Sequence, residues 1–186
     1  METMQAVAAR RSFLERLAGA TLLHRETYEE VEADRGANVE ALAVVLLSSA
    51  AAGVGSAGFG TRGLTAVALF SVIALLSWGT WAFVTTQIGA KLFPEPQTRA
   101  DVGELLRTTG FAAGPGIVRV LCIAPVLAFP VLVVSSLWML IAMIVAVRQA
   151  LDYTSTARAV MVCVLGWTVA IGFALLFGVV FGPRLA

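Results

Sequence analysis

One glycine pattern resembles a nucleotide-binding site. Gly53-Val-Gly55-Ser-Ala-Gly58 matches G-x-G-x-x-G, in which a strand-to-helix turn holds a dinucleotide pyrophosphate. That site also needs an acidic residue about 20 positions later, and after the glycines no acid occurs until Glu95. Small residues fill positions 48–60 instead, and in a membrane they let helix backbones approach closely. We therefore interpret Gly53, Gly55 and Gly58 as helix-packing positions.

Three further residue sets could ligate a metal or take part in catalysis. His24 has no nucleophile and orienting acid in a recognised order. Cys122 and Cys163 lack other soft ligands for zinc, so buried, reduced thiols are favoured. A run of acids lacks the D-x-D-x-D-G spacing of a calcium loop, which favours a solvated helix face; its members are Glu26, Glu29, Glu30, Glu32 and Asp34. We expect no catalytic residue, metal or cofactor, and a protein that is not an enzyme.

Four arginines flank long apolar segments and are the candidate interaction residues. Arg107, Arg119, Arg148 and Arg158 all fall on the same side of the membrane in the topology predicted below. One interpretation is a single basic patch that binds a partner. The other is topological, because arginines near the ends of spans fix orientation and touch lipid phosphates. Both interpretations place the guanidinium groups at the cytoplasmic surface.

The tryptophans also allow two interpretations. Trp78 and Trp81, with Trp138 and Trp167, either line a ligand cavity or serve as packing and interface anchors, which is the commoner role. Pumps and ion-coupled carriers place ionisable residues inside their spans. Only arginines at predicted span ends are present here, which disfavours ion-driven transport. A passive pathway formed by an oligomer stays open.

Composition defines the elements that carry these residues. Of 186 residues, 59% are hydrophobic and 13% are charged, against about 25% charged in soluble domains. Four segments without any charge exceed the roughly 18 residues needed to cross a bilayer; they are 41–61, 63–90, 120–147 and 159–183. The chain is therefore predicted to be a polytopic membrane protein. A net charge of +1 gives no reason to expect nucleic acid, and two cysteines cannot form a disulfide framework.

The segment 111–151 decides the number of spans. It either folds as a hairpin that turns at Phe129-Pro130, giving five spans, or forms one kinked helix, giving four. With five spans and a cytoplasmic N-terminus, 11 lysines and arginines lie inside and two outside; with four spans the division is 10 to three. We predict an all-α bundle with the C-terminus outside and spans at about 41–60, 64–90, 113–129, 131–150 and 159–181.

Two shorter helices are expected on the cytoplasmic side. Residues 1–38 carry five arginines and seven acids, which argues against a cleaved signal peptide and for a cytoplasmic arm ahead of the membrane domain 39–186. An amphipathic helix in this arm lies on the membrane surface or packs on the spans; its apolar side holds Met4, Val7, Phe13, Leu14, Leu17 and Ala18. A second, interfacial helix is predicted from a Thr98 N-cap to Gly110.

Three parts of the chain resemble the Yip domain, a five-span module named for Ypt/Rab-interacting proteins, in its short prokaryotic form. Similar sequences often have Asp just before the Glu-Thr stretch, where its side chain can cap the helix; this chain has His24 there instead. The matching stretches are Ser12-Phe-Leu-Glu-Arg-Leu-Ala-Gly with Glu26-Thr-Tyr-Glu-Glu-Val-Glu; Trp78-Gly-Thr-Trp-Ala with Ile88-Gly-Ala-Lys-Leu-Phe93; and Leu105-Leu-Arg-Thr-Thr-Gly-Phe-Ala-Ala-Gly-Pro115 with Val145-Ala-Val-Arg-Gln-Ala-Leu151.

The resemblance implies a non-enzymatic membrane adaptor or scaffold. Eukaryotic members associate with small GTPases and with one another in vesicle traffic, through an extended cytosolic N-terminal region. Only about 38 residues precede the first predicted span here, so this sequence alone does not support GTPase binding. The partners expected are the lipid bilayer and other membrane proteins or further copies of the chain, in a prokaryotic cytoplasmic (inner) membrane. Two alternatives are an accessory subunit of a larger membrane complex and a small passive transporter or channel.

Overall fold

The computed structural model describes residues 11–60, 63–96, 98 and 101–181, and over these residues the chain is helical without a strand. The predicted positions Met4 and Val7 lie outside them. Seven α-helices are joined by two 3₁₀ segments, η1 (Ser56–Phe59) and η3 (Gly114–Ile123), and by the π-helical turn η2 (Ile88–Leu92). The α-helices are α1 (Phe13–Thr21), α2 (Arg25–Ala33), α3 (Ala37–Gly55), α4 (Leu64–Gln87), α5 (Val102–Phe111), α6 (Pro125–Ala150) and α7 (Thr156–Phe181).

Among the described residues, three helical segments are long and apolar enough to cross a bilayer. They are Ala37–Phe59, Leu64–Leu92 and Pro125–Ala150, with 23, 29 and 26 residues. At 1.5 Å per residue each exceeds the roughly 30 Å of a hydrocarbon core. In α7 the apolar stretch with described side chains is the shorter Thr156–Val169. The predicted all-helical membrane architecture is therefore confirmed, whereas five membrane-spanning helices are not.

The segment 111–151 folds back on itself, but not where the sequence predicted. Ala124 is extended (ψ 114°), and α6 begins at Pro125 and continues through Pro130. The predicted turn at Phe129-Pro130 is therefore wrong. Proline is well suited to the first helical position and biases the residue before it away from helix, so Pro125 marks the turn. Arg119 in η3 donates to the hydroxyl of Ser136 in α6 (3.1 Å), although 17 residues separate them, and this contact excludes a single kinked helix because 17 residues of helix would span about 25 Å.

Helix α5 and η3 together accompany α3 along most of its length. Near the start of α3, a Cβ at Gly110 of α5 would lie 2.8 Å from the Ala41 Cβ. Beyond the end of α3, the carbonyl of Cys122 in η3 occupies the space where a Cβ at Gly58 would lie. Because 3₁₀ geometry rises about 2.0 Å per residue, the ten residues of η3 cover roughly 20 Å. The predicted third span is thus replaced by two short helices. The N-cap of α5 is Asp101, whose carboxylate accepts from the Gly103 N–H, and not the predicted Thr98.

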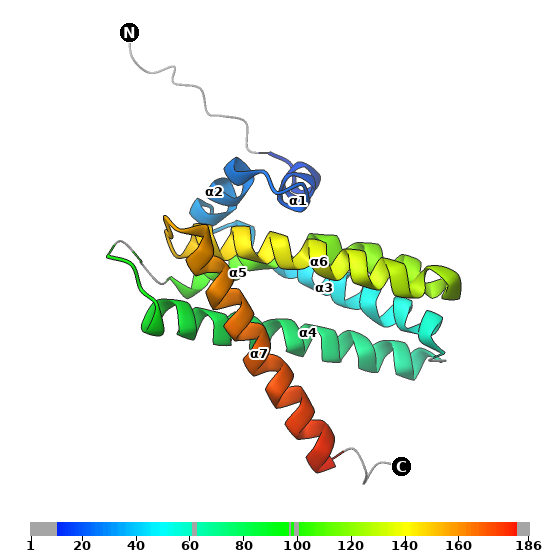
Figure 1. Ribbon diagram of the computed structural model, residues 1–186. Helices are drawn as coiled ribbons and strands as arrows, with labels where there is room; N and C mark the ends of the chain where they lie inside the picture. Colours follow the sequence, from blue (N-terminus) through cyan, green and yellow to red (C-terminus); the bar gives the residue numbers. More distant parts are fainter. Residues whose placement is uncertain (1–10, 61–62, 97, 99–100, 182–186) are drawn as a thin grey trace.

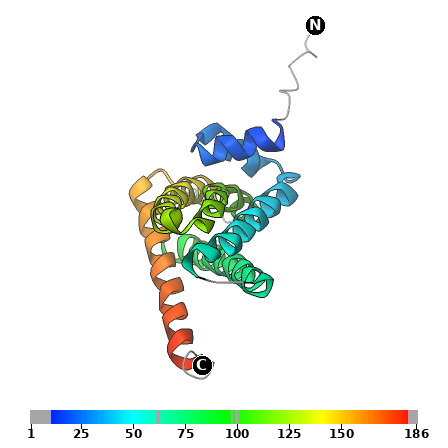
Figure 2. The same cartoon turned by 90° about the vertical axis from the view of Figure 1, so that its right-hand side faces the viewer.

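The helices form a bundle with a separate N-terminal layer. In Figure 1, α3, α4 and α6 run side by side, while α7 crosses α4 and then diverges from them. Figure 2 shows α1 and α2 over one side of this bundle and the end of α7 on the opposite side. The start of α1 has a full capping box, in which Ser12 and Glu15 satisfy each other's backbone N–H. His24 occupies the N-cap of α2 without a side-chain hydrogen bond.

Close backbone contact explains the small residues of α3. A Cβ at Gly55 would overlap the carbonyl oxygen of Arg119 in η3, and one at Gly53 would overlap Ser71 in α4. Gly58, in the η1 turn that follows α3, likewise has no room beside the carbonyl of Cys122. Backbone atoms cannot rotate away as side chains do, so these glycines set the distance between α3 and its neighbours.

Gly55→Ala is therefore expected to lower the free energy of unfolding by about 1 to 3 kcal/mol through overpacking. The control is Gly79→Ala in α4, where a Cβ meets nothing within 4 Å and alanine favours helix by up to about 1 kcal/mol. Thermal unfolding of both variants in the same detergent measures the difference. Equal stability of Gly55→Ala and wild type would mean that η3 does not pack against α3 as described.

Candidate functional site

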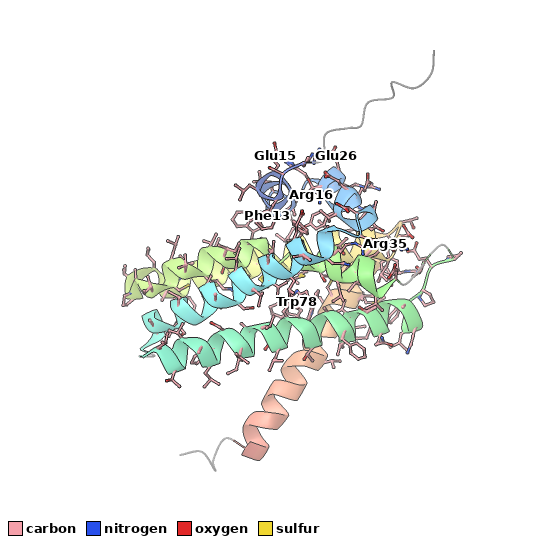
Figure 3. The ribbon with its side chains drawn as sticks, turned by 180° about the vertical axis from the view of Figure 1, so that it is seen from behind. Phe13, Glu15, Arg16, Glu26, Arg35 and Trp78 are labelled. Carbon is pink, nitrogen blue, oxygen red and sulfur yellow. The ribbon has the colours of Figure 1, made fainter. Side chains whose placement is uncertain are left out.

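Arg16 organises the N-terminal layer formed by α1 and α2, which is here called the cap (residues 12–34). Its side chain is almost fully buried, with 1% relative exposure, and lies between the two helices (Figure 3). Three carboxylates surround it: Glu30 at 2.8 Å, Asp34 at 2.9 Å and Glu40 at 3.0 Å. Burial alone would lower the pKa of Arg16, but hydrogen bonds to these carboxylates outweigh it and raise the pKa. The guanidinium therefore links α1, α2 and α3.

This arrangement corrects the expectation of a solvated acidic face. Glu26 and Glu29 are exposed as predicted, but Glu30 and Asp34 turn toward Arg16. A buried guanidinium left without partners would be strongly destabilising, so these carboxylates compensate its charge. On the far side of α2, the Tyr28 hydroxyl donates to the Ala20 carbonyl, and burial raises the Tyr28 pKa.

Arg107 fastens the cap to α5. It is 4% exposed and donates to the backbone carbonyls of Val31 and Glu32 and, at 3.3 Å, to Asn38 Oδ1. Those carbonyls belong to the last turn of α2, where no further helical N–H is available and where the helix dipole favours a cation. Arg107, which the sequence predicted to lie at the surface, is thus buried and supplies hydrogen-bond donors to the last carbonyls of α2.

Arg148 and Arg158 lie together at the turn between α6 and α7. Arg148 donates to the carbonyls of Tyr153 and Thr154, and Arg158 donates to the Pro94 carbonyl at 3.2 Å. Buried Glu95 ties the turn down, since it pairs with Arg158 at 3.4 Å and accepts from both the N–H and the hydroxyl of Thr154. These contacts hold the end of α4 next to the start of α7.

Arg119 lies elsewhere, inside the helix bundle. Its Nε donates to Ser135 at 3.3 Å and its Nη2 to Ser136 at 3.1 Å, halfway along α6. The four candidate arginines therefore do not form a single patch: Arg148 and Arg158 are neighbours, whereas Arg107 is buried against α2 and Arg119 is half-buried against α6. Their predicted role in interaction or anchoring stays a prediction.

The predicted tryptophans divide between packing and a cavity. Trp78 donates to the Thr109 carbonyl (3.4 Å) and Trp138 to the Thr21 carbonyl (2.8 Å), which ties α1 to α6. Trp78, Trp81 and Trp167 also line one cavity with Arg119. Cys122 and Cys163 are both buried and free.

Helix α1 has two unlike sides. Arg16, Gly19 and Ala20 face inward, and Phe13 and Leu17 pack partly against the core. An apolar stripe faces outward at helical spacing, with Leu14 70% exposed and Leu22 60% exposed; Ala18 completes it. The predicted single apolar side is therefore split. Phe13 and Leu17 pack on the protein and account for the folding of α1. The outward stripe is exposed and is available to bind another surface.

The fold and these contacts define a helical membrane protein whose bundle carries an ordered N-terminal cap. A family model, the Yip1 domain, matches residues 21–178, which is most of the chain. The protein therefore belongs to the Yip1 domain family, as its sequence resemblance predicted. No curated protein and no solved structure matches the chain. Most of α1 precedes the matched residues.

Sequence reasoning missed Arg16, Glu95 and the two serines that hold Arg119. A signal for Arg16 was present, because α2 carries more acids than its own arginine can balance. Glu95 and Ser135 gave none: their partners are 59 and 16 residues away, and nothing in local spacing reports such pairs.

Proposed function

We propose that this protein is a non-enzymatic adaptor or scaffold of the Yip family that gathers other proteins at a membrane. The observation that carries the proposal is the apolar stripe Leu14, Ala18 and Leu22 on a rigidly held helix. Arg16, Arg107 and Trp138 fix the cap to the bundle, so the stripe is presented in one orientation. The three residues adjoin one another at i, i+4 spacing, a contiguous exposed apolar patch marks a protein–protein or membrane interaction site, and preorganisation lowers the entropic cost of binding.

Affinity purification of the full-length protein from membranes in mild detergent, followed by mass spectrometry, tests the adaptor role. We expect Leu14→Glu with Leu22→Glu to lose specific partners that wild type retains. Val102→Glu is the matched control, because Val102 is 56% exposed on α5 and lies outside the stripe. If the double variant is folded and keeps every partner, the stripe is not the binding surface.

Three results, from this purification and from two further measurements, separate the alternatives. Fixed stoichiometry with one set of membrane subunits favours an accessory subunit of a larger complex. Solute flux through liposomes that contain this protein alone favours a passive transporter or channel. Recovery of differently tagged copies of the chain together favours self-association.

We further propose five passes, with the N-terminus in the cytoplasm and the C-terminus outside. Support comes from the contacts of Glu95 with Thr154 and of Arg158 with Pro94, which hold the loop after α4 beside the turn before α7. In this topology η3 and the end of α5 make the third pass, and α7 leaves from the cytoplasmic end. With Arg119 inside the third pass, ten lysines and arginines lie on the cytoplasmic side and two outside, a division that agrees with this topology.

Reporters fused after Pro94 and after Asp152 are therefore expected to report the cytoplasm, and one after Ala186 the opposite side. Paired reporters, one active only inside and one only outside, serve as internal controls for each fusion point. A cytoplasmic reading after Ala186 would contradict the five-pass topology while leaving the adaptor proposal intact.

A further inference from the structure

A cavity of about 400 Å³ lies between α4, η3, α6 and α7, and it is partly open. Its walls are largely apolar: three tryptophans, Trp78, Trp81 and Trp167, and the methionines Met139 and Met143 contribute to them. Trp78 lies on the side of α4 that faces the other helices (Figure 3). At the mouth, Trp167 is 40% exposed and Ser77 is exposed. The opening is therefore between apolar helices rather than at the cap.

One cation lines this apolar space. Arg119 reaches it from η3, and its neighbours Ser136, Ala74 and Met139 lie near the middle of α6 and α4. The two serine hydroxyls are its hydrogen-bond partners, and among the described residues no carboxylate pairs with it. A guanidinium has five donors, so most of them are left for another acceptor. Trp81 adds a buried indole N–H that has no partner in the described chain.

Arg119 is half-buried, and a guanidinium among apolar helices without a paired carboxylate is energetically costly; such residues usually mark a ligand or ion site. The chemistry that offsets the cost is an oxyanion, because the planar guanidinium fork matches phosphate and carboxylate geometry. The apolar walls add a second requirement. A small hydrated anion would leave the tryptophans and methionines without contacts, whereas an acyl chain would fill the space beside them.

We propose that this cavity binds an anionic lipid, with the oxyanion of its headgroup on Arg119 and an acyl chain against Trp78, Trp81 and Trp167. The site goes beyond the proposed adaptor role and does not depend on it. A zwitterionic lipid fits less well, because its quaternary amine would have to be desolvated beside Arg119 with no carboxylate among the described residues to pair with it. The cavity mouth between α4, α6 and α7 gives a lipid access from the side.

Quenching of tryptophan fluorescence by brominated lipids tests the proposal on the full-length protein in detergent micelles. Three of the four tryptophans line the cavity, so a bound brominated acyl chain quenches most of the signal. We expect brominated phosphatidylglycerol to reach half-maximal quenching at an about tenfold lower mole fraction than brominated phosphatidylcholine. Arg119→Gln should abolish this preference. Arg35→Gln is the matched control, because it removes the same charge from an exposed side chain and should retain the preference.

Two further arms distinguish the source of the oxyanion and protect against a misfolded variant. Inorganic phosphate alone at millimolar concentration should not displace the brominated lipid; displacement would identify a free anion and overturn the lipid assignment. Ser77→Phe leaves Arg119 and the net charge unchanged but narrows the cavity mouth, so it should also reduce the preference. Equal quenching by both lipids in wild type, or a preference that survives both Arg119→Gln and Ser77→Phe, would overturn the proposal.

Discussion

Replacing Arg16 with methionine is expected to lower the free energy of unfolding by about 2 to 4 kcal/mol. Methionine fills much of the same volume but leaves Glu30, Asp34 and Glu40 without their shared guanidinium. Breaking a buried ion pair costs about 3 to 5 kcal/mol because the remaining charge is uncompensated. The three carboxylates keep 23–27% of their side-chain exposure, so water reduces that cost.

The matched control is Arg25→Met in α2. Arg25 pairs with Glu29 at 2.9 Å, but the two side chains are 70% and 49% exposed, and such pairs contribute about 0.5 kcal/mol or less. Denaturant titration in mixed micelles gives the free energies of unfolding, and limited proteolysis near Arg11 reports the cap itself. If Arg16→Met and Arg25→Met are equally stable, Arg16 does not hold the cap in place.

The charge-free segments predicted the candidate spans well, because the requirement for an apolar stretch of fixed length is local in sequence. Segments 41–61, 63–90 and 120–147 correspond to the three candidate spans. The glycines Gly53, Gly55 and Gly58 likewise indicated close helix packing. The sequence did not show that they would pack against backbone atoms of η3 as well as of α4.

The turn in the segment 111–151 could not be placed from hydropathy. Two prolines, Pro125 and Pro130, offer the same local signal, and only the packing of Gly58 against Cys122 favours the first. Hydropathy also does not distinguish an α-helix from the 3₁₀ geometry of η3, which covers a greater distance with fewer residues. The predicted segment 113–129 is therefore not one helix: η3 fills most of it, and α6 begins at Pro125.

The arginines show most clearly what periodicity cannot report. All four candidates were assigned to the cytoplasmic surface because the predicted topology places the ends of the spans that carry them on that side. Arg107 instead meets carbonyls of α2 that are 75 and 76 residues away, and Arg119 meets two serines of α6. Both depend on tertiary partners, so the burial of Arg107 and the partial burial of Arg119 follow from the fold and not from neighbouring residues.

Replacing Arg107 with leucine is expected to lower the free energy of unfolding by about 2 to 4 kcal/mol. Leucine removes charged donors from the carbonyls of Val31 and Glu32, and a hydrogen bond to a charged group contributes about 1.5 to 3 kcal/mol. Both carbonyls are at the end of α2, where the backbone offers no substitute donor. The change also releases α5 from the cap, so protease sensitivity should rise in residues 12–34 together with the loss of stability.

Arg35→Leu controls for the loss of one positive charge near the same helix end, because Arg35 is exposed and its removal should change stability by less than about 0.5 kcal/mol. Arg107→Lys separates geometry from charge. A lysine ammonium retains the charge but lacks the planar fork that reaches two carbonyls and Asn38 at once, so its stability should fall between those of wild type and Arg107→Leu. Denaturant titration measures the free energies of unfolding of all these variants. If Arg107→Leu is as stable as wild type, the Arg107 guanidinium is not buried against α2 and does not link α2 to α5.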